Sequence, residues 1–102
     1  MTRVVISPRA ERETEDIWLM IAMNDPVAAN RIVRHVGEKI DRLAIHPRLG
    51  PRRPDISPAV RILIEGPYLI IYELQPNTNR GPVQVVDIIS VVDGRRDLTQ
   101  LF

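Results

Sequence analysis

Residues 83–92 read VQVVDIISVV, a nearly unbroken apolar stretch that is rich in β-branched side chains. Such a run predicts a buried β-strand. The stretch leads directly into residues 93–97, DGRRD, whose Asp-Gly pair favours a tight turn. We therefore expect a buried strand to present Arg95 and Arg96 on a turn at the edge of a sheet. That turn is the first candidate for a functional part of the molecule.

Two more strands are predicted immediately before this one. Residues 60–65 and 68–75 are apolar segments separated by a turn-forming Gly-Pro pair. The polar loop 77–81, NTNRG, then leads to residues 83–92. Three strands joined by such short connections predict an antiparallel meander.

Two helices are predicted between a short first strand at residues 3–7 and the meander. The Ser-Pro pair at residues 7–8 fits the N-cap and first position of one helix, which we expect to close with Asn24 in a left-handed conformation. The Asp-Pro pair at residues 25–26 repeats the start signal for a second helix, which we expect to continue until Pro47. Helices joined so closely should lie antiparallel.

The predicted order of elements, β-α-α-β-β-β, is typical of an α+β fold. We expect an N-terminal strand followed by an antiparallel helical hairpin packed on one face of a small antiparallel β-sheet. A chain of 102 residues matches one domain, so we expect residues 1–102 to form a single domain.

Both faces of the predicted last strand are apolar. On strict alternation one face carries Val83, Val85, Ile89 and Val91, and the other carries Val86, Ile88 and Val92. A single helical hairpin can cover only one face of the sheet. Either the sheet curls enough to shelter its second face or another chain covers it, and we favour another chain. We therefore expect the isolated protein to aggregate and to become soluble with a partner.

The composition excludes several classes of function. The chain has no cysteine and only two histidines, so we expect no disulfide, no metal site and no cofactor. A net charge of +1 is too small for capture of nucleic acid by the chain as a whole, and we expect no direct sequence-specific DNA binding. No segment is long and apolar enough for a membrane span or an export signal, which predicts a cytoplasmic protein.

The candidate partner-binding residues are arginines and tyrosines from the loop after the second helix and from the last three strands. They are Arg52, Arg53, Arg61, Tyr68, Tyr72, Arg95 and Arg96. The arginines can grip carboxylates of a partner, but Arg53 can instead pair with Asp55 in a solvated loop. One turn arginine can be structural, bonded to Asp93 or Asp97, while the other contacts the partner. The tyrosines can stack on a base or pack against neighbours or a partner.

Three other conspicuous side chains have structural explanations. Trp18 lies at helical spacing and is expected in the core, although it can also anchor an interface. His46 is expected in the last turn of the second helix, where a histidine meets the helix dipole favourably. His35 is expected on a solvated flank of that helix.

These elements and motifs together resemble the ParE/RelE family of bacterial type II toxin–antitoxin toxins, and more specifically its ParE-like branch. The positions that carry the resemblance are Ala10, Ile17 and Ile21, then Asp25-Pro26 with Ala28-Ala29, Leu43, Pro47, Gly50, Arg61, the segment 68–72 (YLIIY) and the segment 94–97 (GRRD). The resemblance implies a toxin held inactive by a ParD-like antitoxin whose C-terminal segment wraps it as a helix and an extended strand. It also implies a hetero-oligomer such as a heterotetramer.

The resemblance leaves two targets open, because ParE-type members are associated with inhibition of DNA gyrase and RelE-type members cut mRNA on the ribosome. Metal-free RNA cleavage needs a general base and acid besides positive charge. Asp93 stands where many relatives carry a histidine before the glycine, no tyrosine follows Tyr72, and Arg95 and Arg96 should lower the pKa of Asp93. The sequence therefore favours a non-enzymatic inhibitor of gyrase and hence of replication. A ribosome-dependent mRNA endonuclease is the alternative, and an inert binding module is a third hypothesis.

Overall fold

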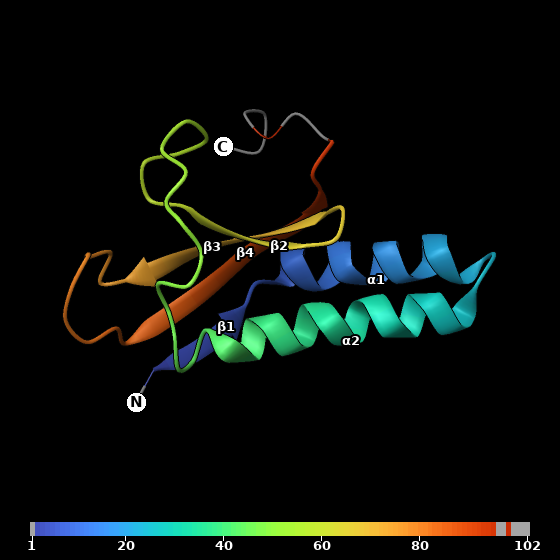
Figure 1. The fold of residues 1–102 in the computed structure, drawn as a ribbon, viewed down its shortest axis with the longest axis horizontal. Helices are drawn as coiled ribbons and strands as arrows, with labels where there is room; N and C mark the ends of the chain where they lie inside the picture. The colour runs from blue at the N-terminus through green and yellow to red at the C-terminus, as the bar shows by residue number, and fades with distance from the viewer. Residues whose placement is uncertain (1, 96–97, 99–102) are drawn as a thin grey trace.

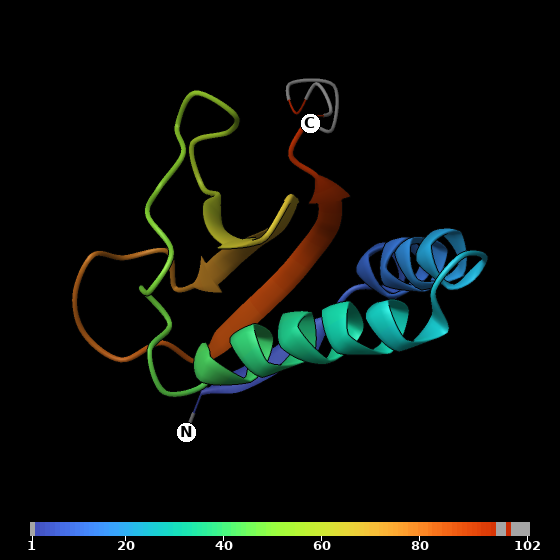
Figure 2. The same cartoon turned by 45° about the vertical axis from the view of Figure 1, so that its right-hand side comes forward.

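The computed structural model describes residues 2–95 and 98 and has the predicted order of elements (Figure 1). The elements are β1 (Arg3–Ile6), α1 (Pro8–Ala22), α2 (Pro26–Arg42), β2 (Arg61–Glu65), β3 (Tyr68–Gln75) and β4 (Val85–Asp93). The two helices form a hairpin on one side of a single sheet, and the turn of the hairpin projects beyond the end of the sheet (Figures 1 and 2). The β-α-α-β-β-β prediction is confirmed.

The sheet is mixed, which corrects the prediction of a purely antiparallel sheet. Its strand order is β1-β4-β3-β2. The meander β2-β3-β4 is antiparallel as expected, but β1 pairs with β4 in parallel, with Arg3 opposite Val85. The helical hairpin returns the chain to the starting end of β1, and an odd number of meandering strands then brings β4 back in the direction of β1.

Both helices begin where the sequence predicts. The side chain of Ser7 accepts a hydrogen bond from the Ala10 amide, and that of Asp25 accepts one from the Ala28 amide. Each therefore satisfies one of the free N–H groups that open a helix.

The predicted helix ends are wrong. No non-glycine residue in the described chain has a positive φ, so Asn24 is not left-handed. The α1 helix ends at Ala22, and tight right-handed turns lead to the next helix. The α2 helix ends at Arg42 rather than near Pro47, and residues 43–45 form tight turns whose amides donate to the Ile40, Asp41 and Arg42 carbonyls. His46 thus lies beyond the helix in a turn, where its amide donates to the Arg42 carbonyl at 2.8 Å.

The helix-bearing face of the sheet carries the larger core. Its buried residues are Ala10, Val36, Ile40, Leu43, Leu63, Ile70, Tyr72, Leu74, Val83, Val86, Ile88 and Val91. The opposite face carries a second cluster of Val60, Ile62, Ile71 and Val92, against which Ile56, Leu69, Ile89 and Leu98 pack. Residues 51–60 rise on the side away from the helices and supply Ile56 and Val60 (Figure 2). The chain thus covers part of its own second face, as in the first of the two alternatives, although Ile64, which pairs with Leu69 on that face, is 60% exposed.

A β-bulge in β4 overturns the predicted alternation of its side chains. Ile71 pairs with Ser90 and Tyr72 pairs with Ile88, so Ile89 has no partner across the ladder. The extra residue reverses the alternation. Val91 therefore joins the helix-facing core, while Ile89 packs with the opposite cluster.

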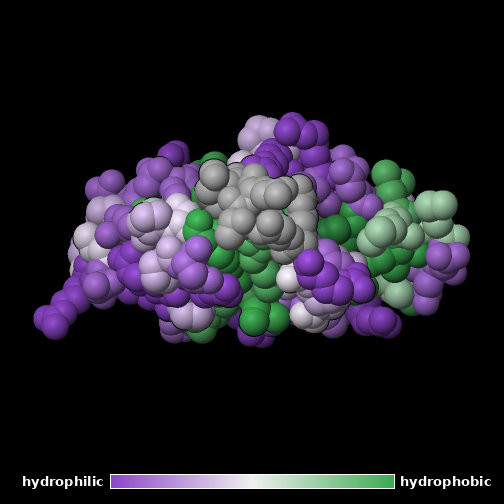
Figure 3. Space-filling model, turned by 90° about the horizontal axis from the view of Figure 1, so that it is seen from above, coloured by the Kyte–Doolittle hydropathy of each residue, from purple (hydrophilic) through white to green (hydrophobic). Residues whose placement is uncertain are grey.

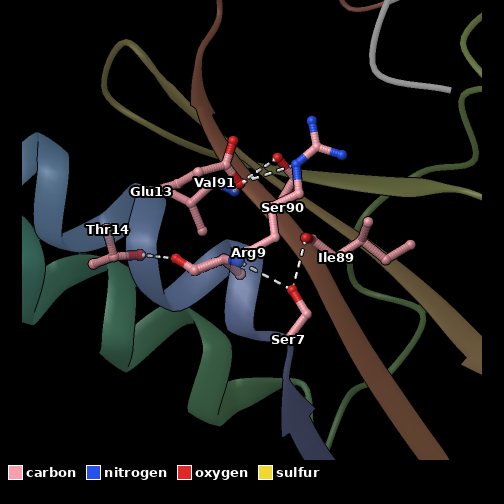
Figure 4. Close-up of polar contacts among 8 residues, drawn as sticks. Ser7, Arg9, Glu13, Thr14, Ile89, Ser90 and Val91 are labelled. Carbon is pink, nitrogen blue, oxygen red and sulfur yellow. Dashed lines mark hydrogen bonds and ion pairs between the residues drawn. The ribbon is translucent and has the colours of Figure 1, made fainter.

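The first turns of α1 hold this bulge in place (Figure 4). One carboxylate oxygen of Glu13 accepts hydrogen bonds from the Ser90 hydroxyl at 2.6 Å and the Val91 amide at 3.2 Å. The Ser7 hydroxyl donates to the Ile89 carbonyl at 2.8 Å. The bulge and the start of α1 thus form one polar joint between the helices and the sheet.

Candidate functional site

Tyr72 lies in the core and clamps the loop that follows α2. Its hydroxyl donates to the Pro47 carbonyl at 2.9 Å and accepts from the Gly50 amide at 2.9 Å. Burial raises the pKa of Tyr72, and the hydrogen bond from Gly50 and the charge of Arg61 oppose this rise only in part. Tyr72 is 0% exposed, so its side chain is not accessible to a partner in this structure.

Gly50 is required by this clamp. A Cβ atom at position 50 would lie 2.6 Å from the Ile62 carbonyl oxygen and 2.9 Å from the Tyr72 hydroxyl. Both distances are shorter than van der Waals contact, and the carbonyl belongs to the backbone of β2. The loop can therefore approach the sheet this closely only with glycine at position 50.

Arg61 lies beside the clamp and is 6% exposed. Its Nη1 donates to the Gly50 carbonyl at 2.9 Å, whereas its buried Nε has no hydrogen-bond partner in the described chain. Desolvation lowers the pKa of Arg61, and the positive charges of Arg52 and Arg48 act in the same direction. Arg61 is thus a buried cation without a counter-ion among the described residues.

Arg48 and Arg52 stand next to Arg61 and are fixed by a second loop. Arg48 donates to the Thr78 carbonyl at 3.0 Å, to the Thr78 hydroxyl at 3.1 Å and to the Gly81 carbonyl at 3.0 Å. Arg52 donates to the Asn79 side-chain oxygen at 2.9 Å. Neither arginine forms an ion pair with a carboxylate of residues 2–95 or 98. We call Arg48, Arg52 and Arg61 the arginine cluster.

Two of the other predicted arginines, Arg53 and Arg95, are paired within the chain. Nε and Nη2 of Arg53 hold both carboxylate oxygens of Asp55, at 3.0 and 2.9 Å, in an exposed loop, which confirms the pairing considered as an alternative to partner binding. Nε of Arg95 likewise holds Asp93 Oδ1 at 3.0 Å, and Nη2 holds Oδ2. Arg95 is therefore the structural arginine of the turn, and Arg96 lies outside the described residues.

The pairing of Arg95 with Asp93 favours the ionised form of the Asp93 carboxyl group. The hydrogen bond from the Arg95 side chain lowers the pKa of Asp93 to about 2, as the neighbouring arginines in the sequence predict. Tyr68, which pairs with Asp93 across the ladder, is almost fully buried. Asp93 is therefore a permanent carboxylate near neutral pH and a very weak base.

The structure divides the predicted residues between two places. Tyr68, Asp93 and Arg95 meet at one end of β3, and Tyr72, Arg61 and Arg52 meet about 13 Å along the same strand, at about 3.3 Å per residue. No single site contains all of them. Among the predicted residues that the structure describes, only Arg61 combines burial with a charge that no carboxylate pairs.

A groove between α1 and α2 was missed by sequence reasoning. Two adjoining hollows of about 350 and 430 Å³ share Thr14, Glu15 and Val33 and run from Ile6 to Trp18. Trp18 is 37% exposed and donates to the Asn30 side chain at 2.8 Å, so its expected place in the core is wrong. Residues 17–23, IWLMIAM, could have indicated this surface. They are apolar on every side of the helix, whereas a helix that packs on a sheet needs only one apolar stripe.

Apolar side chains also gather at the turn of the hairpin, at the right of Figure 3. The exposed apolar residues there are Trp18, Leu19, Met20, Met23 and Val27. Met23 is 84% exposed, which is unusual for so apolar a side chain. We call these five residues the hairpin-end patch. Patches of this kind commonly mark protein-interaction surfaces.

The described residues contain neither a cluster of metal ligands nor a helix that could span a membrane. No three histidine, aspartate or glutamate side chains within residues 2–95 and 98 gather closely enough to hold a metal ion. Neither helix in that part of the chain has the length and apolar character that crossing a membrane requires.

The chain was compared with known proteins and structures. A family model described as the ParE toxin of the type II toxin–antitoxin system, parDE, matches residues 4–98. Toxin ParE1 of Mycobacterium tuberculosis, in strains H37Rv and CDC 1551, is 30% identical over 89 residues, which cover 86% of this chain and 88% of that protein. A solved structure described as a chromosomal ParDE TA system from P. aeruginosa superimposes with a TM-score of 0.72 at 20% identity, covering 91% of this chain and 96% of that one.

The fold and its surfaces define a small α+β domain with an apolar groove and an uncompensated arginine cluster. The chain belongs to the ParE toxin family of type II toxin–antitoxin systems. The ParE-like resemblance seen in the sequence motifs is thereby confirmed, and the match over residues 4–98 covers both helices and every strand except Arg3, the first residue of β1.

Proposed function

We propose that this ParE-type toxin stops growth by binding DNA gyrase and so blocking replication, rather than by cutting RNA. The observation that carries the proposal is the state of the turn after β4. Cleavage of RNA without a metal needs a group that takes the ribose 2′-hydroxyl proton near neutral pH. Asp93, with a pKa of about 2 and both oxygens held by Arg95, is unsuited to that task.

Tyr72 offers no better support for RNA cleavage. The hydroxyl of Tyr72 is buried and hydrogen-bonded to the 47–50 loop, and burial raises its pKa. Arginines contribute positive charge to a phosphoryl transition state but no proton transfer, because they stay protonated. Binding to a protein target needs only the exposed surfaces that the domain has.

We further propose that a ParD-like antitoxin neutralises the toxin in the cytoplasm by laying a helix into the groove between α1 and α2. The floor of the groove is apolar, and Gly37 has no heavy atom within 4 Å of the position that a Cβ would take. Glu11 and Glu15 line the α1 side, which favours a partner helix with basic residues along that flank. The hairpin-end patch would be covered by the same helix, and we expect two toxins on an antitoxin dimer.

The target is tested by pulse-labelling DNA and protein synthesis after inducing the toxin without its antitoxin. The proposal expects DNA synthesis to stop first and purified gyrase to lose supercoiling activity when the toxin is added. Protein synthesis stopping first, with cleavage of ribosome-bound mRNA, would establish the endonuclease instead. Unchanged growth would identify an inert binding module and refute both.

The antitoxin is tested by coexpression with the small reading frame beside the toxin gene and by measuring the mass of the complex in solution. Leu19→Asp should weaken the complex about 10-fold or more, because it places a charge in the apolar groove. Ile45→Asp is the matched control, since Ile45 is as exposed as the patch residues but lies outside the groove. Equal effects of the two changes would rule out the groove as the docking site.

A further inference from the structure

Two loops without acidic residues meet at the end of the molecule that lies away from the turn of the helical hairpin (Figures 1 and 2). They are residues 46–54, HPRLGPRRP, and residues 76–84, PNTNRGPVQ. Together they contain four arginines and no aspartate or glutamate, whereas the whole chain has a net charge of only +1. This end of the molecule is therefore strongly basic, and the rest of the chain is net negative.

Three of these arginines converge on the second loop. Arg48 donates to two carbonyls of that loop, and Arg52 donates to its Asn79 side chain. Arg80 lies in the same loop, between the residues that these two arginines hold. Arg61 is buried beside them, where desolvation lowers its pKa and the charges of Arg52 and Arg48 lower it further, so the positive charges are close enough to act on one another. We call Arg48, Arg52 and Arg80 the loop arginines.

The loop arginines keep free N–H groups that a ligand can reach. Nη1 of Arg48, both Nη groups of Arg52 and the whole Arg80 guanidinium make no hydrogen bond to the described residues. Arg80 is exposed, and the free groups of the other two are accessible to solvent, since Arg61 Nε is the buried side-chain nitrogen that lacks a partner in the described chain. Arg48 also lines a hollow of about 390 Å³ together with His46. Two of the three guanidinium groups are thus anchored on one side and open on the other.

The surroundings of the loop arginines fit a phosphate backbone better than the surface of a protein. Residues 77–81, which the arginines frame, read NTNRG and carry no apolar side chain. Interfaces with proteins usually centre on apolar or aromatic anchors. Phosphate oxygens, in contrast, are held by arginine together with threonine and asparagine side chains, which are the residue types gathered here.

A duplex fits this surface better than a single strand. Proteins hold single strands mainly by stacking the bases on aromatic side chains. The aromatic residues of the described chain lie elsewhere, because Tyr68 and Tyr72 are buried and Trp18 lines the groove near the turn of the hairpin. We propose that the loop arginines bind the phosphate backbone of duplex DNA without reading its sequence. Duplex DNA is what the proposed target, gyrase, acts on, and to that extent the inference rests on the proposed function.

The test titrates purified toxin against a short labelled DNA duplex, without gyrase, and follows fluorescence anisotropy at several salt concentrations. We expect a Kd on the order of 10⁻⁵ M at low salt, because only a few charges make contact. The logarithm of Kd should rise with the logarithm of the salt concentration with a slope of about 2.7, since each of three phosphate contacts contributes about 0.9.

Arg80→Gln is the informative variant, because the Arg80 side chain makes no contact within the described residues that the fold could lose. It should raise Kd about three- to tenfold and lower the salt slope by about 0.9. Arg80→Lys should keep most of the affinity, because a phosphate also binds an ammonium group. Arg31→Gln is the matched control, since it removes one positive charge from an exposed position in the first half of α2, and it should change Kd less than about twofold.

The outcomes separate this inference from the proposed function. A Kd above about 10⁻³ M at low salt, or equal effects of Arg80→Gln and Arg31→Gln, would overturn DNA binding by the loop arginines. Tighter binding of a single-stranded RNA than of the duplex would assign a single strand to this surface instead. Weaker antitoxin binding by Arg80→Gln, with DNA binding unchanged, would assign an acidic peptide. A toxin that binds DNA through Arg80 but leaves gyrase active would reject the proposed function alone.

Discussion

Replacing Tyr72 with phenylalanine isolates the contribution of one hydroxyl to the toxin fold. The change keeps the buried ring. It leaves two backbone groups of the loop after α2, the Gly50 amide and the Pro47 carbonyl, without their hydrogen bonds to the hydroxyl. The Gly50 amide is buried and loses its acceptor, which costs about 1–3 kcal/mol, and the half-buried Pro47 carbonyl loses a donor, which costs about 0.5–1 kcal/mol. We expect a loss of about 2–3 kcal/mol, or roughly 10–20 °C in melting temperature for a domain of this size.

The assay is urea denaturation followed by circular dichroism, with Tyr68→Phe as the matched control. Tyr68 lies four residues earlier on β3 and is also buried, but its hydroxyl forms no hydrogen bond to the described residues. We expect the control to change the free energy of unfolding by less than about 0.5 kcal/mol. Equal losses for the two variants, or a loss below about 1 kcal/mol for Tyr72→Phe, would show that the hydroxyl does not clamp the loop.

The remaining predictions concern two glycines and one carboxylate. In denaturation experiments, Gly50→Ala should destabilise the fold by about 1–3 kcal/mol, because its Cβ would lie 2.6 Å from the Ile62 carbonyl oxygen. Gly37→Ala should stabilise the fold by about 0.5–1 kcal/mol, because alanine favours the α2 helix and its Cβ meets no heavy atom within 4 Å. Carbon-detected NMR titration should give Asp93 a pKa of about 2, which should return toward 3.8 in Arg95→Ala. Because this pKa is depressed on folding, the ion pair should stabilise the toxin above about pH 4 and be lost as the pH falls through 2.

The elements of the fold were predictable because their signals are local. The Ser-Pro and Asp-Pro pairs at residues 7–8 and 25–26 start the helices through contacts within three residues. The meander follows from short polar connections between apolar runs. The helix ends were misjudged because Asn24 only permits a left-handed turn, and the hydrogen bonds to the Ile21 carbonyl made that turn unnecessary.

The candidate site was predictable only as a set of residue types. Sequence chemistry identified the pairing of Arg53 with Asp55 and the low pKa of Asp93, since those partners are neighbours in the chain. It did not predict that Tyr72 and Arg61 would be buried, because this depends on a loop that only Gly50 lets approach the sheet. The bulge in β4 could not be predicted from the sequence either, since it is held by Glu13 of α1, which is far away in the chain.

The parallel pairing of β1 with β4 has a consequence for how this toxin comes into being. The two strands lie next to each other, with β1 at the edge of the sheet, yet the Ser7 hydroxyl and the Ile89 carbonyl are 82 residues apart in the chain. A nascent chain on the ribosome can form the helical hairpin early, but it has no sheet to pack on until the last strand emerges. The sheet is therefore completed only after synthesis has passed Asp93, the last residue of β4.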